Sequence, residues 1–190
     1  MRIQEGVDPQ DPLVFDSQQL HRQPGASQKL QREVPIDMSW RNDVSAAVSG
    51  GPIPVEFLLE SAHDGILVAA QGRIPLEANC VRCLNPTEWQ EDIHVQQFYA
   101  YPEHANDGDV EAEGDVAEIR GDYLDFRDAF RDAVVLALPL TPTCSEDCLG
   151  LCSQCGFVMA KDPQHKHEEI DPRWSELAKF ADPDRPAQGE

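Results

Sequence analysis

The chain has 190 residues, a formal net charge of −20 and a hydrophobic share of 41%. This length suits one domain with a real core, alone or with a small appendage. A surface this acidic repels phosphate backbones, because nucleic-acid binding depends on Lys and Arg displacing counterions, so RNA contact is expected to be local at most.

The sequence also predicts where the protein resides. No apolar run approaches the roughly 18 residues that a membrane span needs. The first residues, MRIQEGVDPQDP, include no apolar stretch that could act as a signal peptide. We therefore expect a cytoplasmic protein that has no membrane contact, and in that compartment its six cysteines stay reduced.

The N-terminal part of the chain contains the first predicted elements. Residues 1–12 hold little that could pack and are expected to be a disordered lead. A capped helical turn is predicted at residues 18–22, and a strand at residues 29–36.

One stretch of this acidic chain has a positive local charge. Its cations are Arg22, Lys29, Arg32 and Arg41. They are either an ordinary solvated surface or a docking strip for RNA or an acidic protein. Both interpretations fit the sequence, and under the second one the four cations are a candidate partner-binding site.

Alternating apolar residues predict a β-hairpin and a long strand in the middle of the chain. Apolar side chains recur at every second position over residues 55–60 and again over residues 66–70. The turn between these two runs, residues 62–65, contains Asp-Gly. Residues 72–78 either extend the second strand or start a third. The pattern resumes over residues 89–101, so Cys80 and Cys83 are predicted to lie at a turn between strands.

The next segments predict a loop and a helix. Residues 103–121 are acidic and almost free of core side chains, so we expect a mobile loop. A helix is predicted from Asp122, as its N-cap, to Pro139, where it must stop. A short terminal helix is expected at residues 172–180, and residues 182–190 are expected to be a disordered tail.

The spacing of the cysteines and histidines along the chain predicts metal binding. Cys-x-x-Cys turns let two thiolates bind one tetrahedral zinc ion at about 2.3 Å. The candidates form close pairs along the chain: Cys80/Cys83, Cys144/Cys148, Cys152/Cys155 and His165/His167. Exposed histidines without a role are an alternative interpretation of the last pair.

Several groupings of these candidates are compatible with the sequence. We prefer two zinc sites, one made of Cys80, Cys83, Cys144 and Cys148, the other of Cys152, Cys155, His165 and His167. One rival is a single ribbon-like site of Cys80, Cys83, Cys152 and Cys155. Another places the four clustered cysteines around one ion and leaves Cys80 and Cys83 free. The expected cofactor is therefore zinc, one or two ions per chain.

The order of the motifs resembles the YceD family of large ribosomal RNA accumulation proteins. The resemblance covers roughly residues 12 to 180. The resemblance rests on these motifs, in this order: Cys80-Val81-Arg82-Cys83-Leu84, an acidic loop, a helix running into Ala137-Leu138-Pro139, the cysteine cluster with Gly150-Leu151, and Ile170-Asp171-Pro172-Arg173-Trp174. The resemblance implies a non-enzymatic cytoplasmic factor, found in bacteria and plastids, that is needed for normal large-subunit rRNA levels.

Together these features predict an α+β fold. It consists of an antiparallel sheet, either open or barrel-like, with one packed helix over residues 13–140, and a cysteine-rich zinc module with a terminal helix over residues 141–181. The expected function is ribosome biogenesis without catalysis or a small-molecule substrate. The expected partner is a large-subunit precursor or a basic ribosomal protein.

Two enzymatic functions are the alternatives. A thiol redox protein or sensor could use the Cys-x-x-Cys pairs, although neither pair opens a helix after a strand. A zinc hydrolase would need an open coordination position and a general base; Glu146, Glu168 and Glu169 are weak candidates in so acidic a chain.

Overall fold

The computed structural model describes residues 7–20, 22–48, 50–104 and 117–167. The elements are β1 (Val14–Asp16), η1 (Ser17–Gln19), β2 (Ser27–Val34), β3 (Ser45–Ala47), β4 (Ile53–Ser61), β5 (Gly65–Asn79), β6 (Pro86–Ala100), β7 (Ala117–Glu118), β8 (Tyr123–Asp125), α1 (Arg127–Ala137) and η2 (Met159–Lys161).

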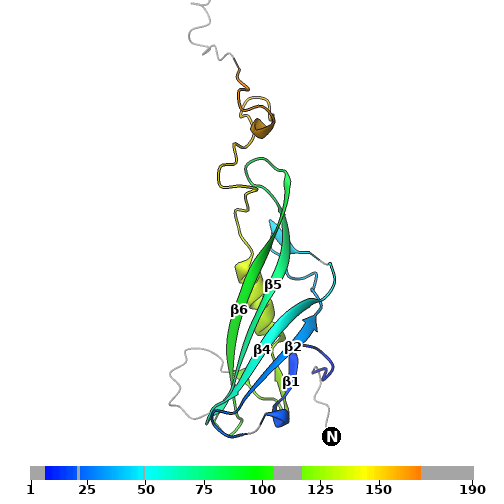
Figure 1. The fold of residues 1–190 in the computed structure, drawn as a ribbon, viewed down its shortest axis with the longest axis vertical. Coiled ribbons are helices and arrows are strands. Elements are labelled where there is room, and N and C mark those ends of the chain that lie inside the picture. Colours follow the sequence, from blue (N-terminus) through cyan, green and yellow to red (C-terminus); the bar gives the residue numbers. More distant parts are fainter. Residues whose placement is uncertain (1–6, 21, 49, 105–116, 168–190) are drawn as a thin grey trace, which may run out of the picture.

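Strands β4, β5 and β6 form an antiparallel meander that dominates the fold (Figure 1). The predicted hairpin is confirmed, with the Ala62 N–H donating to the Gly65 carbonyl at 2.9 Å across its turn. A Cβ at Gly65 would collide with the Tyr99 carbonyl, so a residue without a side chain lets β5 and β6 approach here. Residues 72–78 extend the second strand, and the Cys80 turn joins β5 to β6 as predicted.

The main sheet is open. Its strand order is β2-β4-β5-β6-β7, with β3 pairing the far end of β5. The barrel-like alternative is wrong, since β2 and β7 lie at opposite edges of the described sheet. The short strand β1 pairs with β8 in a separate two-stranded sheet.

Helix α1 packs against one face of the sheet. Phe130 and Val134 point inward and are buried, and the Phe130 ring lies 5.5 Å from that of Trp40. Phe15, Phe57 and Phe126 stack edge-to-face in the same core. This face of the sheet therefore holds the hydrophobic core, as the period-2 pattern of β4 predicts.

The helix begins later than the sequence predicts. Asp122 is not its N-cap, because residues Tyr123–Asp125 form β8 and pair with β1. The Asp122 carbonyl accepts the Ser17 N–H at 2.8 Å, which fixes it outside the helix. Pro139 ends the helix as predicted, with Ala137 its last residue.

The predicted acidic loop, residues 103–121, is shorter than expected. Residues Ala117–Glu118 pair in parallel with β6, and Ile119 is buried. The predicted helix at 172–180, the tail at 182–190, residues 105–116 of the loop and the first six residues of the lead lie outside the described residues.

No helix in the described part of the chain has both the length and the apolar character needed to span a bilayer.

Candidate metal centre

The Cys80 turn lies at the tip of the two longest strands (Figure 1). The Leu84 N–H donates to the Cys80 carbonyl at 2.8 Å, and the Cys80 N–H donates to the Asn85 carbonyl at the same distance. Leu84 has φ = 60°, a left-handed conformation that non-glycine residues rarely adopt. This tight turn brings the Cys80 and Cys83 side chains to one side.

The Cys152 turn repeats this local structure. The Gly156 N–H donates to the Cys152 carbonyl at 2.9 Å, and the Cys152 N–H donates to the Phe157 carbonyl at 2.8 Å. Gly156 occupies the left-handed position with φ = 72°. The same hydrogen-bond pattern thus presents both Cys-x-x-Cys pairs.

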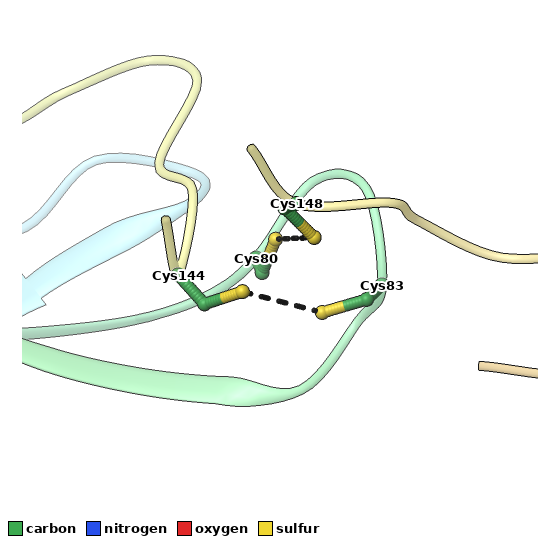
Figure 2. A group of neighbouring side chains, drawn as sticks. All are labelled: Cys80, Cys83, Cys144 and Cys148. Carbon is green, nitrogen blue, oxygen red and sulfur yellow. Dashed lines mark hydrogen bonds between the residues drawn. The ribbon is translucent and has the colours of Figure 1, made fainter. Parts of the chain in front are cut away.

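The segment that follows α1 carries the other cysteines to the first turn. Ser45 donates its hydroxyl to the Pro139 carbonyl at 2.8 Å, and the Val81 N–H donates to the Pro142 carbonyl at 2.9 Å. These bonds lead the chain from the end of the helix, past β3, to the tip of β5 and β6. Cys144 and Cys148 therefore face Cys80 and Cys83 (Figure 2).

The first cluster has the dimensions of a tetrahedral thiolate site. Its members are Cys80, Cys83, Cys144 and Cys148, and their sulfurs all lie within 4.8 Å of one another. The Cys80–Cys148 and Cys83–Cys144 sulfur pairs are each 3.7 Å apart. Four zinc–sulfur bonds of about 2.3 Å place sulfurs roughly 3.8 Å apart, whereas a disulfide would bring two sulfurs to about 2.05 Å. The geometry fits a shared metal ion.

The second cluster is more exposed and more compact. Its members are Cys152, Cys155, His165 and His167. Cys155 Sγ lies 3.3 Å from His165 Nε2 and 3.2 Å from His167 Nε2, and the two Nε2 atoms are 2.8 Å apart. Two thiolates and two imidazoles are a common zinc ligand set, so this cluster could also hold a metal ion.

Backbone N–H groups favour the thiolate form of the first cysteine in each turn. Those of Cys144 and Cys83 lower the pKa of Cys80 to about 6, and those of Cys155 and Gln154 lower the pKa of Cys152 to about 6. Neighbouring sulfurs, Cys148 first among them, raise the pKa of Cys144 to about 12. Each cluster thus offers a ready thiolate, while a metal ion would have to displace the proton from Cys144.

Arg82 is a functional residue to which the sequence assigned no role. Its guanidinium donates to the carbonyls of Glu146 and Cys148, at 3.0 and 3.2 Å. It therefore holds the Cys144–Cys148 loop against the turn that carries Cys80 and Cys83. Its place between those cysteines was the one signal available, because the carbonyls that it contacts are more than 60 residues away in the chain.

The structure groups the eight candidate ligands as in the preferred pairing. The ribbon-like rival would need Cys80 and Cys83 beside Cys152 and Cys155, and these pairs fall in different clusters. The single-ion rival would leave Cys80 and Cys83 free, whereas both lie against Cys144 and Cys148.

The four cations of the candidate partner strip do not form one surface. Arg22 bonds to Glu103 at 3.2 Å and covers the Tyr101 ring, while Arg41 lies near the opposite end of β6, beside Pro86 and Glu88. Arg32 has a structural role: it donates to the carbonyls of Pro12 and Val14, at 2.9 and 2.7 Å. Its burial there lowers its pKa.

Lys29, the remaining cation of the strip, projects from the face of β2 opposite to that of Arg32, because the two positions differ by an odd number of residues. The four cations therefore do not form a continuous basic strip on the folded protein.

Comparison with known proteins gives one family and several relatives. A family model described as "Large ribosomal RNA subunit accumulation protein YceD" matches residues 68–181. Uncharacterized proteins of Mycobacterium tuberculosis (strain ATCC 25618 / H37Rv) and Mycobacterium bovis are 34% identical over 173 residues, 91% of this chain and 83% of each relative. One from Mycobacterium leprae is 34% identical over 179 residues, 94% of this chain and 82% of the relative. No solved structure matches the chain. The matched region contains both cysteine clusters.

Proposed function

Because the chain belongs to the YceD family of large ribosomal RNA subunit accumulation proteins, we propose that it is a non-catalytic ribosome biogenesis factor that zinc holds in its active shape. In this role it supports accumulation of large-subunit rRNA through a contact with a basic ribosomal protein or a pre-ribosomal particle. The family's description and the two ligand clusters support this function.

The observation that carries the zinc proposal is the first cluster. It joins sulfurs from segments 61 and 68 residues apart, at distances that match a tetrahedral ion. All-thiolate and two-thiolate, two-imidazole ligand sets favour zinc among the common divalent metals. A zinc ion there would staple the segment after α1 to the tip of the sheet.

The donor sets favour a structural role over a catalytic one. Each cluster supplies four protein ligands, which closes a tetrahedral zinc ion to substrate. The sequence contains no phosphate-binding glycine loop, no nucleophile elbow and no His-Glu-x-x-His motif. We therefore propose a binding factor.

The charge of the chain favours a protein partner. With a formal net charge of −20, long-range attraction favours basic proteins, many of which a pre-ribosomal particle exposes, and opposes extended contact with rRNA. Pull-down from cell extract with ribonuclease tests this. We expect large-subunit proteins to be recovered with or without ribonuclease and to be lost as salt rises, whereas recovery of rRNA alone would contradict a protein partner.

A complementation experiment tests the function itself. In cells that lack the protein, the wild-type chain should restore the ratio of large-subunit to small-subunit rRNA, and Cys83→Ser together with Cys144→Ser should not. Glu118→Gln, an exposed change far from the clusters, is the matched control and should restore the ratio. Equal restoration by the double cysteine variant would contradict the role of the first cluster.

Metal analysis tests the number of ions. Purified protein should contain about two zinc ions per chain, since two four-ligand clusters are present, and His165→Ala with His167→Ala should remove about one. A wild-type ratio near one that the histidine changes leave unaltered would restrict zinc to the first cluster.

One observation favours a second candidate function, a thiol redox protein or sensor. The pKa values of Cys80 and Cys152 are lowered to about 6, which makes both cysteines thiolates at neutral pH. Thiol titration of the protein as purified separates the two functions. Reactive thiols and a reversible disulfide in protein without zinc would support redox chemistry, whereas protected thiols released only by chelator support the zinc staple.

A further inference from the structure

The face of the main sheet opposite α1 is uncovered by the described residues. Side chains on this face, which we name the open face, come from alternate positions of β2, β4, β5 and β6 and are exposed or half-buried, except for Ala100 at the end of β6. The intervening positions of β4, by contrast, are buried in the core beside the helix. Figure 1 shows the long, twisted sheet that these strands form.

A hollow of about 540 Å³ lies at the centre of the open face. One cross-strand row runs through it, with Lys29 opposite Leu58 and Leu58 opposite Ala69. The methyl group of Ala69 is the smallest side chain of this row, and longer side chains surround it: Gln31, Glu56, Gln71, His94 and Gln96. The hollow therefore has an apolar floor of Leu58 and Ala69 and a polar rim.

Carboxylates dominate the charge of the open face. Its exposed acidic residues are Glu33, Glu56, Glu60, Glu77, Glu88 and Asp92. Its exposed cations are Lys29 and Arg73, and the Arg73 guanidinium already bonds to Asp92 at 2.7 Å. The six exposed carboxylates of this face outnumber its two exposed cations, so the face attracts positive charge.

We propose that the open face binds an extended, Lys- and Arg-rich segment of a partner protein. The partner's aliphatic stems would cover Leu58 and Ala69, and its charged ends would reach the carboxylates around them. The side-chain amides of Gln31 and Gln96 line the hollow and can pair with an extended backbone. This inference rests on the proposed function for its partner class and adds the surface that recognises it.

Charge excludes the other occupants that the sheet could accept. A second copy would bring two acidic faces together, and RNA would bring phosphates against carboxylates. Residues 105–116 carry five acidic and no basic side chains, and residues 168–190 are also net acidic, so these two segments of the chain are repelled as well.

Binding of a synthetic peptide to the zinc-loaded full chain is the direct test. The probe is a short fluorescein-labelled peptide in which Lys and Arg alternate with Val, and its control has Glu at every basic position. We expect the basic peptide alone to bind, with an affinity that falls as salt screens the charges.

Two face variants and one control locate the site. Glu56→Lys with Glu60→Lys reverses charge beside the hollow, and Ala69→Trp fills the hollow without changing charge; each should weaken binding about tenfold or more. Asp128→Lys with Asp132→Lys alters net charge equally at exposed positions of α1, which lies on the other side of the sheet, and should weaken binding less than threefold. Zinc content and circular dichroism verify that each variant is folded.

Three outcomes would overturn the inference: equal weakening by the face and control variants, tighter binding of an oligouridine probe than of the peptide, or self-association that the face variants abolish. Failure of the proposed function gives a different result. In that case the peptide still binds the open face, but the cysteine variants restore rRNA accumulation in the complementation experiment.

Discussion

The two Cys-x-x-Cys turns share a local structure but differ in what surrounds them. In both turns the residue after the second cysteine has positive φ and donates its N–H to the first cysteine's carbonyl. Cys80 and Cys83 are buried, and their partner sulfurs come from residues 68 and 61 positions away. Cys155 is exposed, and its partner histidines follow it by 10 and 12 residues.

Because of this difference, a metal ion in each cluster should stabilise a different part of the protein. A cross-link that closes a long loop removes more freedom from the unfolded chain than one that closes a short loop. A metal ion in the first cluster would also tie the segment after α1 to β5 and β6, whereas one in the second cluster would order only its own module. The same turn should therefore stabilise the whole domain at one site and a short segment at the other.

The largest effect is expected for Cys83→Ser. Losing one of four ligands should remove about one zinc ion and lower the melting temperature by on the order of 10 °C, because metal-binding energy here is folding energy. Scanning calorimetry with metal analysis measures both. Cys152→Ser is the matched change in the other turn and should also remove about one zinc but shift the main transition little. Equal shifts in melting temperature for the two variants would contradict the different roles of the two clusters.

Arg82→Ala should weaken zinc binding at the first cluster alone, roughly 10- to 100-fold. The guanidinium orients the loop of Cys144 and Cys148 through two carbonyls, and changes beside metal ligands typically act at this scale. Competition with a chromophoric chelator resolves the two affinities. Arg82→Lys should recover part of the loss, since one ammonium can reach one carbonyl. A uniform loss at both clusters would mean that Arg82 acts through general stability.

The stability of zinc-free protein should rise with pH between about 6 and 9. Cys80 and Cys152 have folded-state pKa values of about 6, below their ordinary value of 9.0, so in this window the unfolded chain binds more protons. This stability is complete above pH 9 and disappears as pH falls through 6. The raised pKa of Cys144, about 12, opposes folding only above pH 9.

Urea unfolding at several pH values within that window measures this rise. The double change Cys80→Ser and Cys152→Ser should flatten the dependence, because it removes the two thiols whose pKa values are lowered. An unchanged slope in the double variant would assign the pH dependence to other groups.

The smallest effects concern the left-handed residue of each turn. Gly156→Ala should destabilise the second module by about 1 kcal/mol, since no atom approaches the new Cβ and only the φ of 72° opposes it. Leu84→Gly should relieve a similar strain in the first turn, partly offset by a more flexible unfolded chain, and so stabilise by less. Zinc competition and the melting temperature measure the effects of both variants. Destabilisation by Leu84→Gly would show that the exposed leucine makes contacts that outweigh its strain.

The local sequence determined much of this protein. Apolar side chains recur at every second position on either side of Asp64-Gly65, and this pattern is enough to predict the β4–β5 hairpin. Both the side-chain period and the turn chemistry act over only a few residues. Pro139 is enough to end α1, and the cysteine spacing is enough to indicate pairs of thiols that could share a metal ion.

Tertiary structure decided the features that depend on distant partners. Strand β8 displaced the start of α1 because pairing with β1 satisfies backbone groups that a helix would otherwise use. Arg32 became a structural residue because the carbonyls of Pro12 and Val14 lie beside it in space.

The choice among the three ligand groupings also required the fold. Spacing shows which thiols can share a turn, but the path of the chain after α1 brings Cys144 and Cys148 to the tip of β5 and β6. The open edges and the acidic open face of the sheet likewise follow from strand order. A period-2 pattern fixes which side chains share a face, whereas only the packing of α1 decides which face is covered.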